Sequence, residues 1–413
     1  MSRKSFTWVG VALLALLAGC ESAEFVRAAP EPSICCAPRP WAQGEQGQVD
    51  LLFVIDNSGS MADEQAALQV QFAALMAELR QSKDGLPDLH LGVTSTDLGT
   101  GLFQITYCED VGGDQGNLLT GHCTNPMGSP YIVDVKPVGC EIQQTGDATG
   151  TCASHTCDQS HCVHEWDTVL DEDPVTGCPR CRNYTGESLE SVFTCIASLG
   201  TVGCGFEQPL EAMYKALDFN NTANTGFLRE SALLAVVIIS DEDDCSAADP
   251  ALFDNADEGL NSTLGPLTSY RCFEFGITCD ENDRLHEGRR ENCAPREDAD
   301  AMLHPVSRYT TFLKGLKDPD YLVVSAIAGP VVGGGVTVSR DDYDQPTVDF
   351  SCSTERGGAV PAVRLRAFLE RLSAPEDLSW AHTSICDESY VSALEGVGRR
   401  IRETVDAHCP LSP

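Results

Sequence analysis

Positive charge is scarce in this sequence. Its 27 lysines and arginines stand against 62 aspartates and glutamates, which gives a formal net charge of −35. Proteins that bind nucleic acids or anionic lipid faces carry basic surfaces, because their partners are negatively charged. The charge balance therefore argues against nucleic acid as a partner and suits a domain that is held away from a membrane surface.

Familiar catalytic motifs are also missing. The sequence has no G-x-S-x-G elbow, no H-E-x-x-H pair, no G-x-x-x-x-G-K-[ST] loop and no G-x-G-x-x-G that follows a strand. These patterns place a nucleophile, zinc ligands or a phosphate-binding backbone. We therefore predict that the protein is not an enzyme.

A long apolar run is the third absence. The apolar stretch from Trp8 to Leu17 is shorter than the roughly 20 residues that a membrane-spanning helix needs. Arg3 and Lys4 precede the stretch and small residues follow it, which is typical of a secretory signal. We therefore predict a signal peptide over residues 1–20.

The end of this signal is more specific. Leu17-Ala18-Gly19-Cys20 resembles the lipobox of bacterial lipoproteins, in which the cysteine is lipidated and becomes the first mature residue. The resemblance implies a membrane contact through a lipid anchor on Cys20. Glu21 follows in place of the aspartate associated with inner-membrane retention, which favours the outer membrane.

Cysteine, in contrast, is plentiful. Twenty cysteines are unusual in a reducing cytosol and typical of proteins that are stabilised by disulfides in an oxidising compartment. We therefore predict disulfide bonds and a location in the cell envelope. Without Cys20 the number is odd, so one cysteine is free, bonded to another molecule or engaged otherwise.

The chain divides into a tether and one interrupted domain. Residues 21–48 are rich in Ala, Pro, Gly and Gln, which favours an extended linker. Over residues 49–409, apolar strand patterns alternate with helical patterns, which predicts an α/β domain with a doubly wound, mostly parallel sheet and helices on both faces. Strands are expected at 49–55, 89–93, 102–107, 232–239, 321–328 and 383–386, and helices at 64–79, 187–199, 207–217, 306–316, 360–372 and 390–405. Two Cys-rich insertions, 108–184 and 245–303, interrupt this domain.

One loop carries the strongest functional signal. The expected strand 49–55 runs directly into Asp56-Asn57-Ser58-Gly59-Ser60, and a helix follows. Ligands of open parallel sheets bind beyond the carboxyl ends of the strands. A D-x-S-x-S turn at that place directs one carboxylate and two hydroxyls toward one point, and hard cations such as Mg²⁺ prefer oxygen ligands. The sequence therefore predicts a divalent cation in this loop.

Here the chain resembles the von Willebrand factor A (vWA) family and its metal-ion-dependent adhesion site. Residues 51–61 look like the first strand and metal loop of the family, and Ile238-Ile239-Ser240-Asp241 is similar to its fourth strand and last metal-loop aspartate. The resemblance implies a Rossmann-like fold that holds Mg²⁺, or Mn²⁺ or Ca²⁺. The implied ligands are Asp56, Ser58, Ser60, Thr201 and Asp241.

The middle ligand and the partner follow from the same resemblance. The family places a threonine in a middle loop, for which Thr201 is the candidate and Asp97 the substitute. It also implies that a partner protein offers an acidic residue to the open position of the metal, in adhesion or complex assembly.

Two other patterns leave alternatives open. In Asp241-Glu242-Asp243-Asp244 only Asp241 has a counterpart in the family; the other three acids either bind a second cation such as Ca²⁺ or form a solvated loop, and the acidic composition favours the loop. A second group gathers cysteines and histidines: Cys152, His155, Cys157, His161, Cys162, His164, Cys178 and Cys181. Such a group can bind zinc, which would make the protein a metal-handling envelope protein, but disulfides are expected in an oxidising compartment. A disulfide-stapled scaffold with a vestigial metal site is the remaining alternative.

Overall fold

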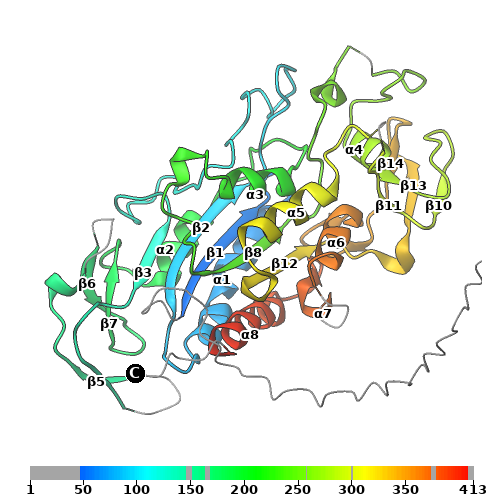
Figure 1. Ribbon diagram of the computed structural model, residues 1–413. Helices are drawn as coiled ribbons and strands as arrows, with labels where there is room; N and C mark the ends of the chain where they lie inside the picture. The colour runs from blue at the N-terminus through cyan, green and yellow to red at the C-terminus, as the bar shows by residue number, and fades with distance from the viewer. Residues whose placement is uncertain are drawn as a thin grey trace, which may run out of the picture.

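An eight-stranded sheet forms the centre of the protein (Figure 1). The computed structural model describes residues 47–145, 151–162, 168–256, 258–298, 301–373 and 378–407, so the predicted signal peptide, Cys20 and most of the tether lie outside the described residues. The strand order is β17 (His382–Ser384), β12 (Leu322–Ala328), β8 (Leu233–Ile239), β1 (Gln48–Ile55), β2 (Asp88–Ser95), β3 (Ile132–Val135), β7 (Pro179–Arg182) and β6 (Val169–Glu172).

The sheet is mixed. Parallel pairing joins β17, β12, β8, β1 and β2, whereas β3, β7 and β6 are added through antiparallel pairing. The three added strands all come from the first expected insertion. The prediction of a mostly parallel sheet therefore describes the central part, and the antiparallel part was not predicted.

Helices flank both faces because the central strands carry apolar side chains on both faces. In β1, Leu51, Phe53 and Ile55 belong to one apolar cluster, and Leu52 and Val54 belong to another on the opposite face. Successive side chains of a strand point to opposite faces, so an uninterrupted apolar strand must be covered on both. The first cluster includes side chains of α1 (Ala62–Leu79), α2 (Leu189–Ile196) and α8 (Val391–Ala407), and the second includes those of α3 (Pro209–Leu217), α5 (Val306–Leu316) and α6 (Val363–Glu370).

All of the predicted helices and all but one of the predicted strands are confirmed, with small shifts at their ends. The exception is the strand expected at 102–107, where the structure has turns and irregular backbone. Phe103 and Ile105 pack there against a small apolar cluster outside the sheet. Short apolar runs favour a strand by pattern, but packing against a neighbouring loop satisfies the same side chains. The strand that pairs with β2 on the side opposite β1 is β3.

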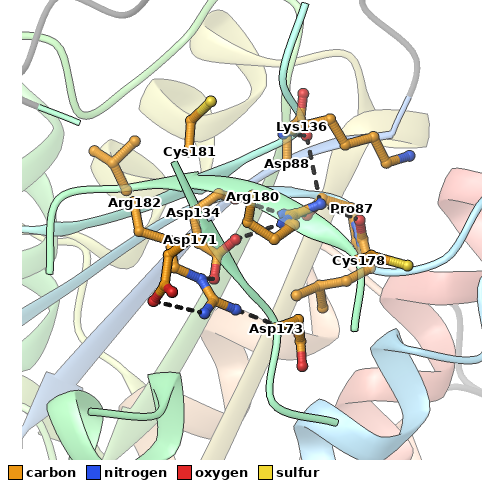
Figure 2. A network of polar contacts seen from close by, with 12 residues as sticks. Pro87, Asp88, Asp134, Lys136, Asp171, Asp173, Cys178, Arg180, Cys181 and Arg182 are labelled. Carbon is orange, nitrogen blue, oxygen red and sulfur yellow. Dashed lines mark hydrogen bonds and ion pairs between the residues drawn. The ribbon is translucent and has the colours of Figure 1, made fainter. Parts of the chain in front are cut away.

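A buried ionic group fastens the added strands (Figure 2). Asp134 of β3 is fully buried and accepts hydrogen bonds from Arg180 Nε at 2.5 Å, Arg182 Nε at 3.0 Å and the Tyr184 hydroxyl at 2.5 Å. Burial by itself raises the pKa of a carboxyl group, but the two guanidinium groups outweigh this effect and hold the pKa of Asp134 below its ordinary value. The carboxylate is therefore charged and compensated by the chain itself.

The same arginines connect β7 to its surroundings. Arg180 donates to the main-chain carbonyls of Leu86 and Pro87 just before β2, at 3.0 and 2.8 Å. Arg182 lies 3.4 Å from the carboxylate of Asp173, which is also buried. These contacts lock the antiparallel strands to the parallel part of the sheet.

Disulfides pair every cysteine of the described residues. The bonds are Cys108–Cys204, Cys123–Cys195, Cys140–Cys157, Cys152–Cys178, Cys162–Cys181, Cys245–Cys272, Cys279–Cys293 and Cys352–Cys386. Cys20, Cys35, Cys36 and Cys409 lie outside the described residues. The predicted disulfides are confirmed, and such a set is typical of an oxidising compartment. In the described ranges, none of the helices has the length and apolar character needed to span a bilayer.

Short strands and helices lie outside the eight-stranded sheet. The first insertion also contains the β4–β5 pair (Ile142–Gln144 and Cys152–His155), and the second contains α4 (Tyr270–Gly276) with the β9–β11 pair (Ile277–Thr278 and Ala294–Pro295). A three-stranded sheet joins β10 (Gly288–Arg290), β13 (Val336–Arg340) and β14 (Pro346–Val348), and β15 (Cys352–Ser353) pairs with β16 (Gly358–Ala359). The short helix α7 (Leu378–Ala381) precedes β17.

Candidate metal centre

Asp56 lies at the carboxyl end of β1. Its main-chain N–H donates to the Ile239 carbonyl at 2.9 Å, which continues the pairing of β1 with β8. Its fully buried carboxylate accepts hydrogen bonds from the Ser58 N–H at 2.8 Å and from the Ser240 hydroxyl at 2.7 Å. The hydroxyl oxygens of Ser58 and Ser60 are 3.2 Å apart. The segment 56–60, called the metal loop below, therefore gathers one carboxylate and two hydroxyls.

Asp241 follows β8 and faces the same loop. Its carboxyl group shares a hydrogen bond with Ser60, while its Oδ1 is buried without a hydrogen-bond partner. The next strand in the sequence, β2, lies on one side of β1, and the later strand β8 lies on the other side. The direction in which successive strands are added to the sheet therefore changes between β1 and β8. Open α/β sheets bind ligands at such a switch point, beyond the carboxyl ends of the strands. The structure thus brings four of the five predicted ligands together at a place suited to a ligand.

The Thr201 loop, residues 200–206, packs directly on the metal loop. Gln65 of α1 donates to the carbonyls of Asp56 and Gly200, both at 2.9 Å. The Gly203 N–H donates to the Asn57 carbonyl at 2.9 Å, and any side chain at position 203 would collide with the Asn57 amide. These bonds hold the half-buried Thr201 beside the centre.

Asp97, the substitute for Thr201, has a different environment. Its Oδ1 accepts from the Gly99 N–H at 2.8 Å, and its Oδ2 accepts from the Cys204 N–H at 3.1 Å. Burial raises its pKa, and the nearby charges that add to this shift belong to Asp114 and Asp110 rather than to Asp56. Asp97 thus organises the turn after β2 and the neighbouring Thr201 loop.

Two carboxyl groups outside the predicted ligand set of this centre adjoin it. Glu207, at the end of the Thr201 loop, is buried and shares a hydrogen bond with Glu242, and the charge of Asp56 acts on both. Glu207 Oε1 is buried without a hydrogen-bond partner, as is Asn57 Oδ1. Glu242 stood out only as part of an acidic run. Glu207 had no signal beyond its place at the start of a predicted helix.

These carboxyl groups lack a compensating positive charge. Burial raises the pKa of Asp241 to about 8, and the charges of Asp56 and Glu242 add to the shift. Burial likewise raises the pKa of Glu242 to about 7, and it raises the pKa values of Asp56 and Glu207. No lysine or arginine of the described segments forms an ion pair with any of the four. Without a cation, the centre therefore retains protons at neutral pH.

The acidic run 241–244 is not the solvated loop that its composition favoured. Asp244 is buried, pairs with Arg364 at 3.0 Å and accepts from the Leu210 N–H at the start of α3, also at 3.0 Å. Asp243 accepts from the Arg364 N–H at 2.9 Å at the start of α6. Helix N-termini and a buried arginine stabilise these charges. Because Asp243 and Asp244 have partners within the protein, composition alone predicted the wrong environment for this part of the run.

The cysteines of the cysteine and histidine group all form disulfides. Cys178 and Cys181, the C-x-x-C pair, bond to Cys152 and Cys162 rather than to each other. Cys157 bonds to Cys140. No thiolate of this group remains to bind zinc, so the described part of the insertion matches the expected disulfides. His164 lies outside the described residues.

The centre relies on hydroxyls as much as on carboxylates. Within the described ranges, no three His, Cys, Asp or Glu side chains are placed to hold one metal ion. The predicted ligand set contains only two such residues, Asp56 and Asp241, and takes its other oxygens from hydroxyl groups.

No protein-family model matches the chain. No curated protein matches it either.

Proposed function

We propose that the protein binds a divalent cation, preferably Mg²⁺, at the metal loop and uses it to capture a partner protein. Ser58 and Ser60 coordinate the ion directly, while Asp56 and Asp241 bind it directly or through water. Thr201 completes the set. The open position accepts an acidic residue of the partner, in adhesion or complex assembly, and no covalent chemistry is involved. Mn²⁺ and Ca²⁺ are the other candidate ions.

One observation supports this proposal. Buried carboxyl groups that form no ion pair with a lysine or arginine of the described residues lie beside two hydroxyl groups at the switch point of the sheet. Burying an uncompensated carboxylate is costly, so such groups either keep protons or bind a cation. Hard divalent ions prefer carboxylate and hydroxyl oxygens and keep bound waters. Few anionic ligands leave the ion electron-poor, which favours an additional carboxylate from outside.

The wider assignment extends this proposal. The residues of the metal loop and of β8 support a vWA-type domain with a doubly wound, Rossmann-like arrangement. The signal pattern and Cys20 support a lipid-anchored protein of the cell envelope, with the outer membrane preferred. The disulfides are consistent with that location.

Two alternatives make different predictions. A metal-handling protein that uses the cysteine and histidine insertion needs reduced thiols, and thiol counting on the native protein would reveal them. A scaffold with a vestigial centre would bind no Mg²⁺. The disulfides disfavour the first alternative, and the four uncompensated carboxyl groups disfavour the second.

The decisive test is isothermal titration of Mg²⁺ into the purified protein and its Asp56→Asn variant. Asparagine removes the charge and keeps one oxygen, which can accept from the Ser58 N–H, while its amide group replaces the oxygen that accepts from the Ser240 hydroxyl. We expect the Asp56→Asn affinity to fall by about 100-fold, which corresponds to roughly 2.7 kcal/mol. Thr201→Val and Asp97→Asn identify the middle ligand, because only its replacement weakens binding. Equal Mg²⁺ affinity in wild type and Asp56→Asn would contradict the proposal.

Partner capture needs its own measurement. The full protein is used to pull down partners from the native envelope in Mg²⁺ and in EDTA, with Asp56→Asn as the matched control. We expect capture in Mg²⁺ by the wild type only. Capture that is undiminished in EDTA would show that the metal does not mediate it.

A further inference from the structure

Three large apolar side chains are exposed beside the metal centre. Leu102, Tyr107 and Val202 have exposed fractions of 84, 64 and 74%. Leu102 and Tyr107 belong to the segment that follows β2, drawn in cyan in Figure 1, and Val202 belongs to the Thr201 loop. The disulfide Cys108–Cys204 joins the two segments next to these residues.

The position of this group relative to the metal loop is fixed by contacts described above. Gly203, next to Val202, is hydrogen-bonded to Asn57 of the metal loop. Cys204 bonds covalently to Cys108, which directly follows Tyr107, and its N–H donates to Asp97. The exposed apolar residues therefore stand on loops that border the centre.

The loops hold these side chains outward on a fixed support. Tyr107 has a φ of +67°, a left-handed conformation that is uncommon for a residue with a side chain. The Cys108 N–H donates to the Ile105 carbonyl at 2.9 Å across the turn that contains Tyr107, and before this turn the Thr100 hydroxyl donates to the Phe103 carbonyl at 2.9 Å. Residues in such conformations concentrate at functional sites, where the surrounding structure fixes them.

The support itself is a small apolar core beneath the exposed residues. It contains the Cys108–Cys204 and Cys245–Cys272 disulfides together with Phe206, Leu252 and Phe253, and Phe103 and Ile105 pack against it. Apolar side chains that belonged to this core would be covered by it. Leu102, Tyr107 and Val202 instead remain in water although buried positions lie close by.

The charges around the group indicate what can dock there. Glu109 and Asp110 are exposed next to Cys108, and the whole chain carries a net charge of −35. An approaching segment with several acidic residues would be repelled, except at the cation itself. A segment that carries lysine or arginine beside one acidic residue is complementary to both features.

We propose that Leu102, Tyr107 and Val202 form an apolar rim that contacts the partner protein beside the metal-bound acid. The occupant is a partner segment in which one Asp or Glu is flanked by apolar side chains, with basic residues farther out. This inference rests on the proposed function and adds the specificity of the same site. The metal holds the acid, and the rim reads the residues next to it.

The test uses short synthetic peptides with one central glutamate and lysines at both ends. In the first peptide leucine and phenylalanine flank the glutamate, in the second serines replace them, and in the third glutamine replaces the central glutamate. Binding to the full protein is followed by fluorescence anisotropy in Mg²⁺. We expect the wild type to bind the apolar-flanked peptide about tenfold more tightly than the serine-flanked one, because apolar area is buried.

A rim variant and a matched control complete the design. In Leu102→Ser/Tyr107→Ser/Val202→Ser the preference for apolar flanks should disappear while the Mg²⁺ affinity stays unchanged. Tyr343→Ser, which replaces another exposed tyrosine away from the centre, should keep the preference; the exposed fraction of Tyr343 is 84%.

The outcomes separate the two proposals. Equal binding of apolar-flanked and serine-flanked peptides by the wild type, an absence of binding by any peptide, or a preference that survives in the rim variant would overturn the rim. Equal binding of the glutamate and glutamine peptides would instead count against metal-mediated capture, whatever the flanks do.

Discussion

Asp134 and Asp56 are both fully buried aspartates of the same sheet, yet their environments have opposite effects. The pKa of Asp134 lies below its ordinary value because Arg180 and Arg182 outweigh the effect of burial. The pKa of Asp56 lies above its ordinary value because burial dominates and only hydrogen bonds to Ser240 and Ser58 oppose it. The difference is the presence of guanidinium groups at one site and their absence at the other.

This difference separates a structural site from a candidate binding site. At Asp134 the chain supplies the positive charge, so the group is complete and pins β3 to β7. At Asp56, Asp241 and Glu242 the positive charge must come from solution, as protons or as a metal ion. Buried acids thus stabilise the fold in one region, and in the other we propose that they bind a cation.

The largest expected effect is the loss of stability in Asp134→Asn. Removing this charge takes the shared carboxylate from two buried guanidinium groups and leaves Arg182 with Asp173 as its buried acidic partner. Breaking a buried ion pair costs about 3–5 kcal/mol in similar cases. Urea unfolding of the oxidised protein in EDTA measures the change. The matched variant is Asp56→Asn, which removes an uncompensated buried charge and should leave stability unchanged or higher. A similar loss in both variants would remove the distinction between the two regions.

The second effect is stabilisation by Mg²⁺. A ligand present at 100 times its Kd stabilises the folded state by about 2.7 kcal/mol, so the melting temperature of the wild type should rise in Mg²⁺. Asp134→Asn should melt at a lower temperature but show the same rise. Asp56→Asn should show none. Differential scanning calorimetry measures all three proteins, and a rise in Asp56→Asn would place the ion elsewhere.

The third effect is a pH dependence of the metal-free protein. A carboxyl group whose pKa is raised on folding binds protons more tightly in the folded state, so stability falls as pH rises through that interval. For Asp241 the interval runs from the ordinary value of 3.8 to about 8, and for Glu242 from 4.5 to about 7. Stability in EDTA should therefore decrease between pH 5 and pH 8, by a few kcal/mol at most. Asp241→Asn should flatten this decrease, and an unchanged slope would show that other groups cause it.

The smallest effect concerns Glu207. Burial and the charges of Glu242 and Asp56 raise its pKa well above the ordinary value. Glu207→Gln keeps the size of the side chain and a hydrogen-bonding group, and it should change the Mg²⁺ affinity by about threefold or less. Titration calorimetry at pH 7.5 provides the measurement. A loss as large as that of Asp56→Asn would make Glu207 a ligand of the ion.

The sequence predicted the central layers well because their patterns are strong. β8 and residues 51–55 of β1 are entirely apolar and α1 has helical spacing, so these elements and the loop between β1 and α1 followed from the residues. The antiparallel strands β3, β7 and β6 were missed because each has only four residues and charged residues interrupt the apolar pattern, among them Asp134, Arg180 and Arg182. Their burial depends on mutual pairing, which no single-strand pattern reveals.

The metal loop followed from the sequence, whereas its surroundings required the fold. Asp56, Ser58 and Ser60 alternate within one short segment of the chain, and Asp241 follows a recognisable strand. Glu207 reaches the centre from a loop whose path is fixed by Gly203 and the Cys108–Cys204 disulfide, and neither constraint is visible in a local pattern. The acidic run misled for the same reason, because the partners of Asp243 and Asp244 lie more than 100 residues away in α6.

The most direct measurement is proton release on Mg²⁺ binding. Titrations of the wild type at pH 7.5 in two buffers with different ionisation enthalpies give the number of protons displaced. Because the pKa of Asp241 is about 8, Mg²⁺ binding should release on the order of one proton. Binding without proton release, or no binding at all, would contradict the conclusion that the cation takes the place of protons among these buried acids.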